Sequence, residues 1–178
     1  MEKMGKTTII FLALPVLAAI AIFYFSKMSA PAVPAENPNR DGQAAKTRTI
    51  KLYYYNPEKD KDAAGNAMCS RAGLAPVERE VLLTKTPVQD AVNLLLKGGL
   101  AESESAAGIG AEFPLPGLAL KGANLDAGIL TLEFDDPQNK TSGGACRAGI
   151  LWFQIEATAK QFSGVEQVRF IPETLFQP

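Results

Sequence analysis

Two cysteines, Cys69 and Cys146, are the side chains of this sequence best suited to covalent chemistry. An even number of cysteines outside the cytoplasm favours one disulfide, and a bridge across so long a stretch would stabilise the fold by about 4 kcal/mol. Two alternatives stay open. Cys146 precedes Arg147 near the start of a predicted helix, where the pKa of a thiol falls and the sulfur becomes a nucleophile. In the other alternative, both thiols are free.

The chain contains no histidine. This composition excludes Ser-His-Asp and Cys-His sites on this chain, together with zinc or haem held by histidine. A reactive cysteine would therefore lack its usual base. The formal net charge of −1 argues against a nucleic-acid-binding protein, because that class carries a basic face for phosphates. We expect no cofactor, no metal site and no nucleic-acid partner.

Two groups of carboxylates deserve a chemical interpretation. Glu133, Asp135 and Asp136 end a predicted strand and offer oxygen ligands to a hard cation, but their spacing is not that of an EF-hand loop. A solvated strand end is the favoured interpretation. Glu102 and Glu104 could act as the acid and base of a glycosidase, which would require a cleft that holds them on opposite sides of a sugar. A polar loop explains this pair better.

Three aromatic residues form the candidate partner surface. Tyr53 and Tyr55 fall on the less apolar face of a predicted strand, and Trp152 lies beside the apolar stripe of a predicted helix. Exposed aromatic side chains are frequent anchors of protein interfaces. Partial burial is the alternative for all three.

The elements that position these residues follow from hydrophobic periodicity and from glycine and proline breaks. We predict strands over residues 49–55, 77–83, 118–123, 128–134 and 165–171, and helices over residues 87–97 and 145–162. The order is β-β-α-β-β-α-β. This order indicates an α+β fold, with a small mixed β-sheet and two helices packed on one face.

Residues 1–28 are predicted to form an N-terminal transmembrane anchor. Residues 7–26 carry no charge, and twenty helical residues span roughly 30 Å, which matches the hydrocarbon core of a bilayer. Lys3 and Lys6 precede this segment and Lys27 follows it, which favours a cytoplasmic N-terminus. A cleaved signal peptide is the alternative, although the apolar run is longer than usual for that role.

Residues 29–47 are rich in proline and alanine and are predicted to be a linker. Residues 48–178 then form one domain outside the cell membrane. The protein would be a single-pass membrane protein that contacts the lipid bilayer through its N-terminal helix. The domain is mildly acidic, so its charge would not attract it to anionic headgroups.

The predicted outer domain resembles a GerMN domain, a module of sporulation and spore germination proteins. Five stretches carry the resemblance: residues 76–79 (PVER), 91–98 (AVNLLLKG), 113–117 (FPLPG), 130–134 (LTLEF) and 144–168 (GACRAGILWFQIEATAKQFSGVEQV). They are similar to the strand entry, first helix, turn, hairpin strand and final helix with strand of that family. Together they span nearly all of residues 53–171.

The resemblance implies a noncatalytic, extracytoplasmic module of the bacterial cell envelope. It brings no catalytic residues with it. We expect a binding or scaffolding role, with envelope proteins or the cell wall as partners, and a homo-oligomer is compatible with the free edges of a small sheet. The rival hypothesis is an envelope enzyme that acts on peptidoglycan or other glycans through carboxylates such as Glu102 or Asp135.

Overall fold

The computed structural model describes residues 45–177. The predicted anchor over residues 1–28 and nearly all of the predicted linker over residues 29–47 lie outside the described residues. Within residues 45–177, no helix has both the length and the apolar character that crossing a membrane requires.

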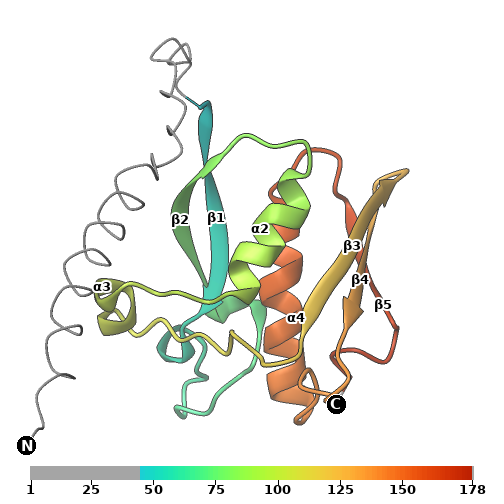
Figure 1. Cartoon of the computed structure of the whole chain (residues 1–178). Helices are drawn as coiled ribbons and strands as arrows, with labels where there is room; N and C mark the ends of the chain where they lie inside the picture. The colour runs from blue at the N-terminus through green and yellow to red at the C-terminus, as the bar shows by residue number, and fades with distance from the viewer. Residues whose placement is uncertain (1–44, 178) are drawn as a thin grey trace, which may run out of the picture. The chain divides into compact units, whose positions relative to one another are not determined.

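The described chain contains five strands, three α-helices and two short 3₁₀ helices (Figure 1). In order they are β1 (Thr47–Tyr55), η1 (Pro57–Lys59), η2 (Arg71–Gly73), β2 (Leu74–Leu82), α2 (Pro87–Leu96), α3 (Glu102–Ala106), β3 (Ala119–Asp126), β4 (Ile129–Asp135), α4 (Ala145–Lys160) and β5 (Gln167–Ile171). The predicted order of long elements is confirmed. The helix α3 falls in a stretch that we predicted to be irregular, since its composition shows no apolar period.

The strands form two separate sheets. β1 and β2 pair antiparallel from Thr47 opposite Leu82 to Tyr55 opposite Leu74. In the second sheet, β4 lies in the middle, antiparallel to β3 and parallel to β5. The parallel pair needs a crossover connection, and α4 supplies it between β4 and β5.

Helices α2 and α4 lie between the two sheets (Figure 1). Helix α2 begins at Pro87, in the first helical position, and is followed by Gly98 at φ +69°. A side chain at position 98 would clash with the backbone of Phe113, since a Cβ there would lie 2.6 Å from the carbonyl oxygen. This close approach fixes the loop after α2 against the core.

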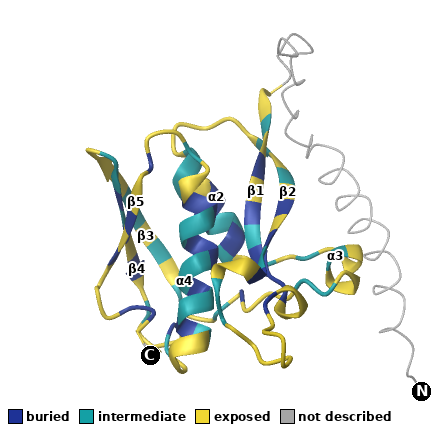
Figure 2. Ribbon diagram, turned by 180° about the vertical axis from the view of Figure 1, so that it is seen from behind, coloured by how far each residue is buried: buried dark blue, intermediate teal, exposed yellow. Residues whose placement is uncertain are grey.

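The core occupies the space between the helices and the inward faces of the sheets, where buried residues gather (Figure 2). Every long element except β3 contributes members: Ile50, Leu52, Tyr54, Val77, Ala91, Val92, Leu95, Leu130, Leu132, Phe134, Leu151, Ile155, Ala159, Val168 and Phe170. Phe113, Val165, Leu175 and Phe176 join them from the connecting segments and the C-terminal turn. Burying side chains of this size is the main favourable contribution to folding.

The prediction of one sheet with both helices on one face is wrong, and the free edge of β1 explains why. The N–H of Lys51 donates to Gln161 Oε1 over 2.8 Å, and Gln161 Nε2 donates to the Lys51 carbonyl over 2.6 Å. The Tyr53 N–H donates to Thr158 Oγ1 over 3.0 Å. We call these contacts the helix–strand ladder. Because side chains of α4 and its C-cap occupy this edge, no other strand of residues 45–177 pairs with β1 there, apart from the single bridge between Tyr55 and Gly110.

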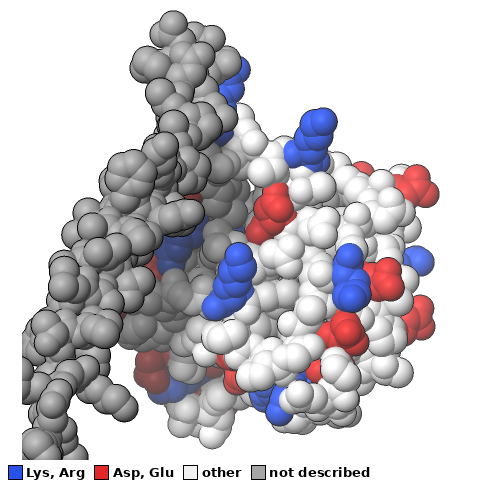
Figure 3. Space-filling model, in the orientation of Figure 1, with Lys and Arg blue, Asp and Glu red and all other residues white. Residues whose placement is uncertain are grey.

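Charged side chains of both signs are interspersed over the visible face of the described residues (Figure 3). No patch of a single sign dominates that face. This distribution offers no electrostatic footprint for a polyanion there.

Candidate functional site

The loop over residues 56–73 lies against α4, from Cys146 in the first turn of the helix to Glu156 in its second half. Cys69 in the loop and Cys146 in the first turn of α4 are joined by a disulfide, with their Cα atoms 5.2 Å apart. Cys69 has a positive φ of 50°, an uncommon conformation for a residue other than glycine. The pairing of these two cysteines ties the loop to the helix and leaves neither thiol available as a nucleophile in this structure.

A second connection between loop and helix is ionic. Arg71 Nη2 pairs with the carboxylate of Glu156, and the Arg71 guanidinium lies 4.1 Å from the centre of the Phe153 ring. Glu156 also pairs with Lys160 over 2.8 Å. Burial acts to raise the pKa of Glu156, but the hydrogen bonds from Lys160 and Arg71 outweigh it and hold the pKa below its ordinary value. The carboxylate therefore stays ionised and keeps the loop on α4.

The carboxylate of Asp60 organises the interior of the loop. It accepts hydrogen bonds from the Ser70 hydroxyl at 2.6 Å, from the Ser70 N–H at 2.5 Å and from the Tyr55 hydroxyl. The hydrogen bonds from Ser70 and Tyr55 lower the pKa of Asp60. Burial and the bond to Asp60 raise the pKa of Tyr55 to about 12, so the phenol remains a proton donor near neutral pH.

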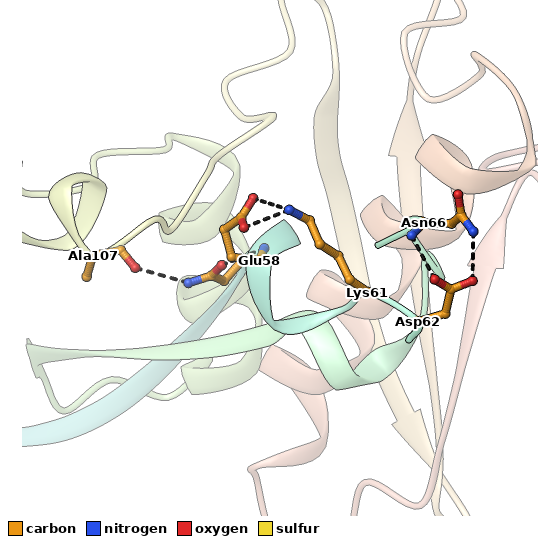
Figure 4. Close-up of polar contacts among 6 residues, drawn as sticks. Glu58, Lys61, Asp62, Asn66 and Ala107 are labelled. Atoms are coloured by element: carbon orange, nitrogen blue, oxygen red, sulfur yellow. Dashed lines mark hydrogen bonds and ion pairs between the residues drawn. The ribbon is translucent and has the colours of Figure 1, made fainter. Parts of the chain in front are cut away.

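Asn56 fixes the start of the loop, two residues before Glu58, which pairs with Lys61 (Figure 4). Its side chain is buried, accepts from the Glu58 N–H at 2.9 Å, and donates through Nδ2 to the Ala107 carbonyl at 3.0 Å. Further out, Asp62 accepts from Asn66 through both the backbone N–H and the side-chain amide. These local bonds give a polar loop a defined shape with little apolar burial.

A cavity of about 200 Å³ opens between this loop and α4. It is lined by Tyr55, Pro57, Gly110, Ala111, Glu112, Ile150 and Gln154. Gln154 has no exposed surface, and neither its Oε1 nor its Nε2 has a hydrogen-bond partner among the described residues. Leaving buried polar groups unpaired costs about 1–3 kcal/mol each, so this amide needs a partner. The cavity beside Gln154 is the strongest candidate binding site in the described chain.

The predicted glycosidase pair does not form a catalytic arrangement. Glu104 accepts from Arg79 through both oxygens, at 2.7 and 2.8 Å, and from the Ala101 N–H at 2.7 Å. The Arg79 bond is the main cause that lowers the pKa of Glu104 to about 2, so this group is a poor general acid. Glu102 lies exposed in the first turn of α3.

The acidic residues after β4 also have structural contacts. Burial acts to raise the pKa of Asp136, but the N–H groups of Lys140 and Thr141 outweigh it and lower the pKa overall. Glu133 and Asp135 are exposed. No cluster of three or more potential metal-ligating side chains occurs within residues 45–177.

The structure places the three predicted surface aromatics in different surroundings. Tyr55 is only 8% exposed and belongs to the interior of the loop. Tyr53 is half-buried on β1, whereas Trp152 is half-buried against Phe170 of the other sheet, with ring centres 4.7 Å apart. The three side chains therefore do not form one surface, and partner binding by Tyr53 or Trp152 stays a prediction.

Sequence reasoning missed the residues that shape this end of the domain, Asp60 and Gln154. A signal for Gln154 exists, because Gln154, Thr158 and Gln161 recur at helical spacing as a polar line beside the apolar stripe of α4. Asp60 lies in a stretch with many polar residues, and nothing in its local pattern marks it as buried.

A family model described as "Germane: Sporulation and spore germination" matches residues 51–173. Among solved structures, the tandem GerMN domains of the sporulation protein GerM from Bacillus subtilis are similar at 18% identity and a TM-score of 0.49. That alignment covers 76% of this chain and 42% of that chain. The first GerMN domain of the same protein is similar at 14% identity and a TM-score of 0.45, covering 68% of this chain and 80% of that one. No curated protein matches.

Proposed function

This chain belongs to the Germane family of sporulation and spore germination domains, and we propose that it is a noncatalytic, membrane-anchored binding module of the cell envelope. In this proposal residues 1–28 cross the cell membrane once, with the N-terminus in the cytoplasm. Residues 29–47 form a tether, and residues 48–178 act outside the membrane on envelope proteins or the cell wall.

The observation that carries the noncatalytic part is the bidentate contact between Arg79 and Glu104. Of the two carboxylates of the glycosidase hypothesis, this contact holds one ionised with a pKa of about 2. A general acid needs a pKa near the working pH, which Glu104 does not have. The disulfide between Cys69 and Cys146 supports the extracytoplasmic part, since such bonds persist in oxidising compartments.

Fusions to the C-terminus of the full chain test the topology. Alkaline phosphatase joined after Pro178 is expected to be active, because that enzyme matures only outside the cytoplasm, and a green fluorescent protein fusion is expected to be dark. The opposite pair of results would show that the domain faces the cytoplasm and would refute the proposed location.

The binding role is tested by photocrosslinking in intact cells from position 53, with position 121 on β3 as a matched control. We expect discrete products from position 53 that position 121 does not give. Products that are the same from both positions, and that match the abundance of envelope proteins, would refute a specific partner at this surface. Wall digestion by the purified chain that is lost in Glu102→Gln or Asp135→Asn would instead identify an enzyme.

A further inference from the structure

Helix α4 and its C-cap present two glutamine side chains along one line, since residues 154, 158 and 161 recur every three or four positions. Gln161 shows which partner a glutamine on this line can bind. Its amide takes both hydrogen bonds of one extended residue: Lys51 donates its N–H to Oε1, and its carbonyl accepts from Nε2. Glutamine at this spacing therefore pairs with the edge of a β-strand.

Gln154 carries the same group two turns earlier in the helix, but with no partner. The strand residue that corresponds to its level is Tyr55, and Gly110 already occupies it: the Tyr55 N–H donates to the Gly110 carbonyl at 3.3 Å, and the reverse bond is 2.7 Å. The amide of Gln154 is thus excluded from β1. Gln154 lines the cavity, but both of its amide atoms are covered in the free chain, so a ligand can reach them only when the side chain turns toward the cavity.

We propose that the cavity beside Gln154 binds one residue of an extended peptide, whose N–H donates to Gln154 Oε1 and whose carbonyl accepts from Gln154 Nε2. In an extended strand the N–H and C=O of one residue point to the same side, which matches the donor and acceptor of a single glutamine amide. Gln161 and Lys51 provide this pairing within the same molecule.

The size and walls of the cavity agree with a peptide residue. A volume of about 200 Å³ is smaller than the roughly 300 Å³ at which pockets for drug-sized molecules begin, but exceeds the about 30 Å³ that one water fills. Tyr55, Pro57 and Ile150 supply apolar wall for a small side chain. At the rim, Glu112 accepts from Arg147 Nε at 2.9 Å, so this acid is already neutralised by a partner.

This inference deepens the proposed function, because it assigns a chemistry to the partner: a peptide segment in extended conformation. It rests on the binding role for the source of that peptide, but not on the membrane location. A failure of the fusion experiment would therefore leave the cavity proposal intact, and the reverse also holds.

The test uses the full chain in detergent micelles with ¹⁵N-labelled glutamine. The probe is N-acetyl-alanine N-methylamide, which offers one residue with its N–H and C=O, and the control is the same compound with the alanine N–H replaced by N-methyl. We expect the probe to shift the Gln154 side-chain resonances saturably. The control compound is expected to bind about tenfold more weakly, which corresponds to about 1.4 kcal/mol.

Two variants complete the design. Gln154→Met replaces the amide by an apolar side chain of similar size and is expected to weaken probe binding about tenfold. Gln167→Met, at an exposed position of β5, is expected to bind like the parent chain. The proposal is wrong if the probe and its N-methyl control shift Gln154 equally, or if no saturable shift occurs. It is also wrong if the free protein shows Gln154 paired with Ala111 or another residue of its own chain, or with an ordered water that the probe does not displace.

Discussion

Gln154 in the middle of α4 and Gln161 at its C-cap carry the same amide on one line, but the two positions use it differently. At the Gln161 end, the helix–strand ladder satisfies the edge of β1 with side chains. At Gln154, the last residue of the strand is already paired with Gly110, and the buried amide has no partner among the described residues beside the cavity that Gln154 lines. The comparison teaches that side chains of a helix can bond to the edge of a small sheet in the position that a further strand would otherwise take. An amide on the same helix that has no such partner is suited to bond with a strand from another molecule.

The largest expected effect comes from removing the disulfide that ties the loop over residues 56–73 to α4. The double change Cys69→Ala/Cys146→Ala removes a link between residues 77 apart, and the free energy of unfolding should fall by about 4 kcal/mol. Urea unfolding of the oxidised parent and the variant measures the difference. The control is intact mass after alkylation: two alkylated thiols in the parent, without reductant, would show that the disulfide is absent.

Breaking the ladder is expected to cost less. Thr158 is fully buried, and Thr158→Val keeps its shape while it removes the acceptor of the Tyr53 N–H. An unsatisfied backbone donor should lower the free energy of unfolding by about 2 kcal/mol. Thr131→Val, on β4 and away from the ladder, is the matched control and should change stability by no more than about 0.5 kcal/mol. Equal effects of the two changes would mean that the ladder contributes nothing specific.

Much of the fold could be predicted from the sequence, because the apolar periods of β1, β4, α2 and α4 are set by burial on one side. The arrangement of the sheets could not, since it depends on Thr158 and Gln161 reaching the backbone of β1 across more than one hundred residues of sequence. Local patterns of polar residues give no sign of such distant partners.

The candidate site was only partly predictable for the same reason. The two cysteines stand out by type, so their pairing could be inferred before their positions were known. Gln154 looks like one more polar residue on a helix, and its burial becomes evident only when Gly110 and β1 are placed beside it. Asp60 is buried by its own loop, and the sequence of that loop has no hydrophobic periodicity from which burial could be predicted.

A third experiment tests β2, the strand of the two-stranded sheet that the ladder does not contact. The pKa of Glu104 is about 2, below its ordinary value of 4.5, chiefly because Arg79 on β2 donates to it. A folded-state pKa below the unfolded one gives stability that is present above about pH 4.5 and is lost as the pH falls toward 2. Glu104→Gln should lose about 1 kcal/mol at pH 7 and show a weaker loss of stability between pH 4.5 and 2 than the parent.

The measurement is the urea midpoint at pH 7, 4.5 and 3, with Glu102→Gln on the same short helix as the matched control. The control should follow the parent at every pH. If Glu104→Gln follows it as well, the ion pair does not stabilise β2, and the pairing with β1 and the core contacts are sufficient to hold that strand.

The smallest expected effects are those of Gln161→Met and Gln154→Met. They test the comparison of the two glutamines directly, because the two changes in the free energy of unfolding are expected to have opposite signs. Gln161→Met removes the two bonds to Lys51 at an exposed position, where water replaces part of them, and should lower the free energy of unfolding by about 1 kcal/mol. Gln154→Met removes a buried amide that has no partner and should raise it by about 1 kcal/mol, since an apolar side chain of similar volume suits the walls. Urea unfolding of both variants against the parent gives the two signs. If Gln154→Met destabilises the protein as Gln161→Met does, then the folded chain already pairs Gln154, and the two glutamines are alike. A gain in stability would instead mean that the fold retains a polar group at a cost, which is the pattern expected of a residue kept for binding rather than for folding.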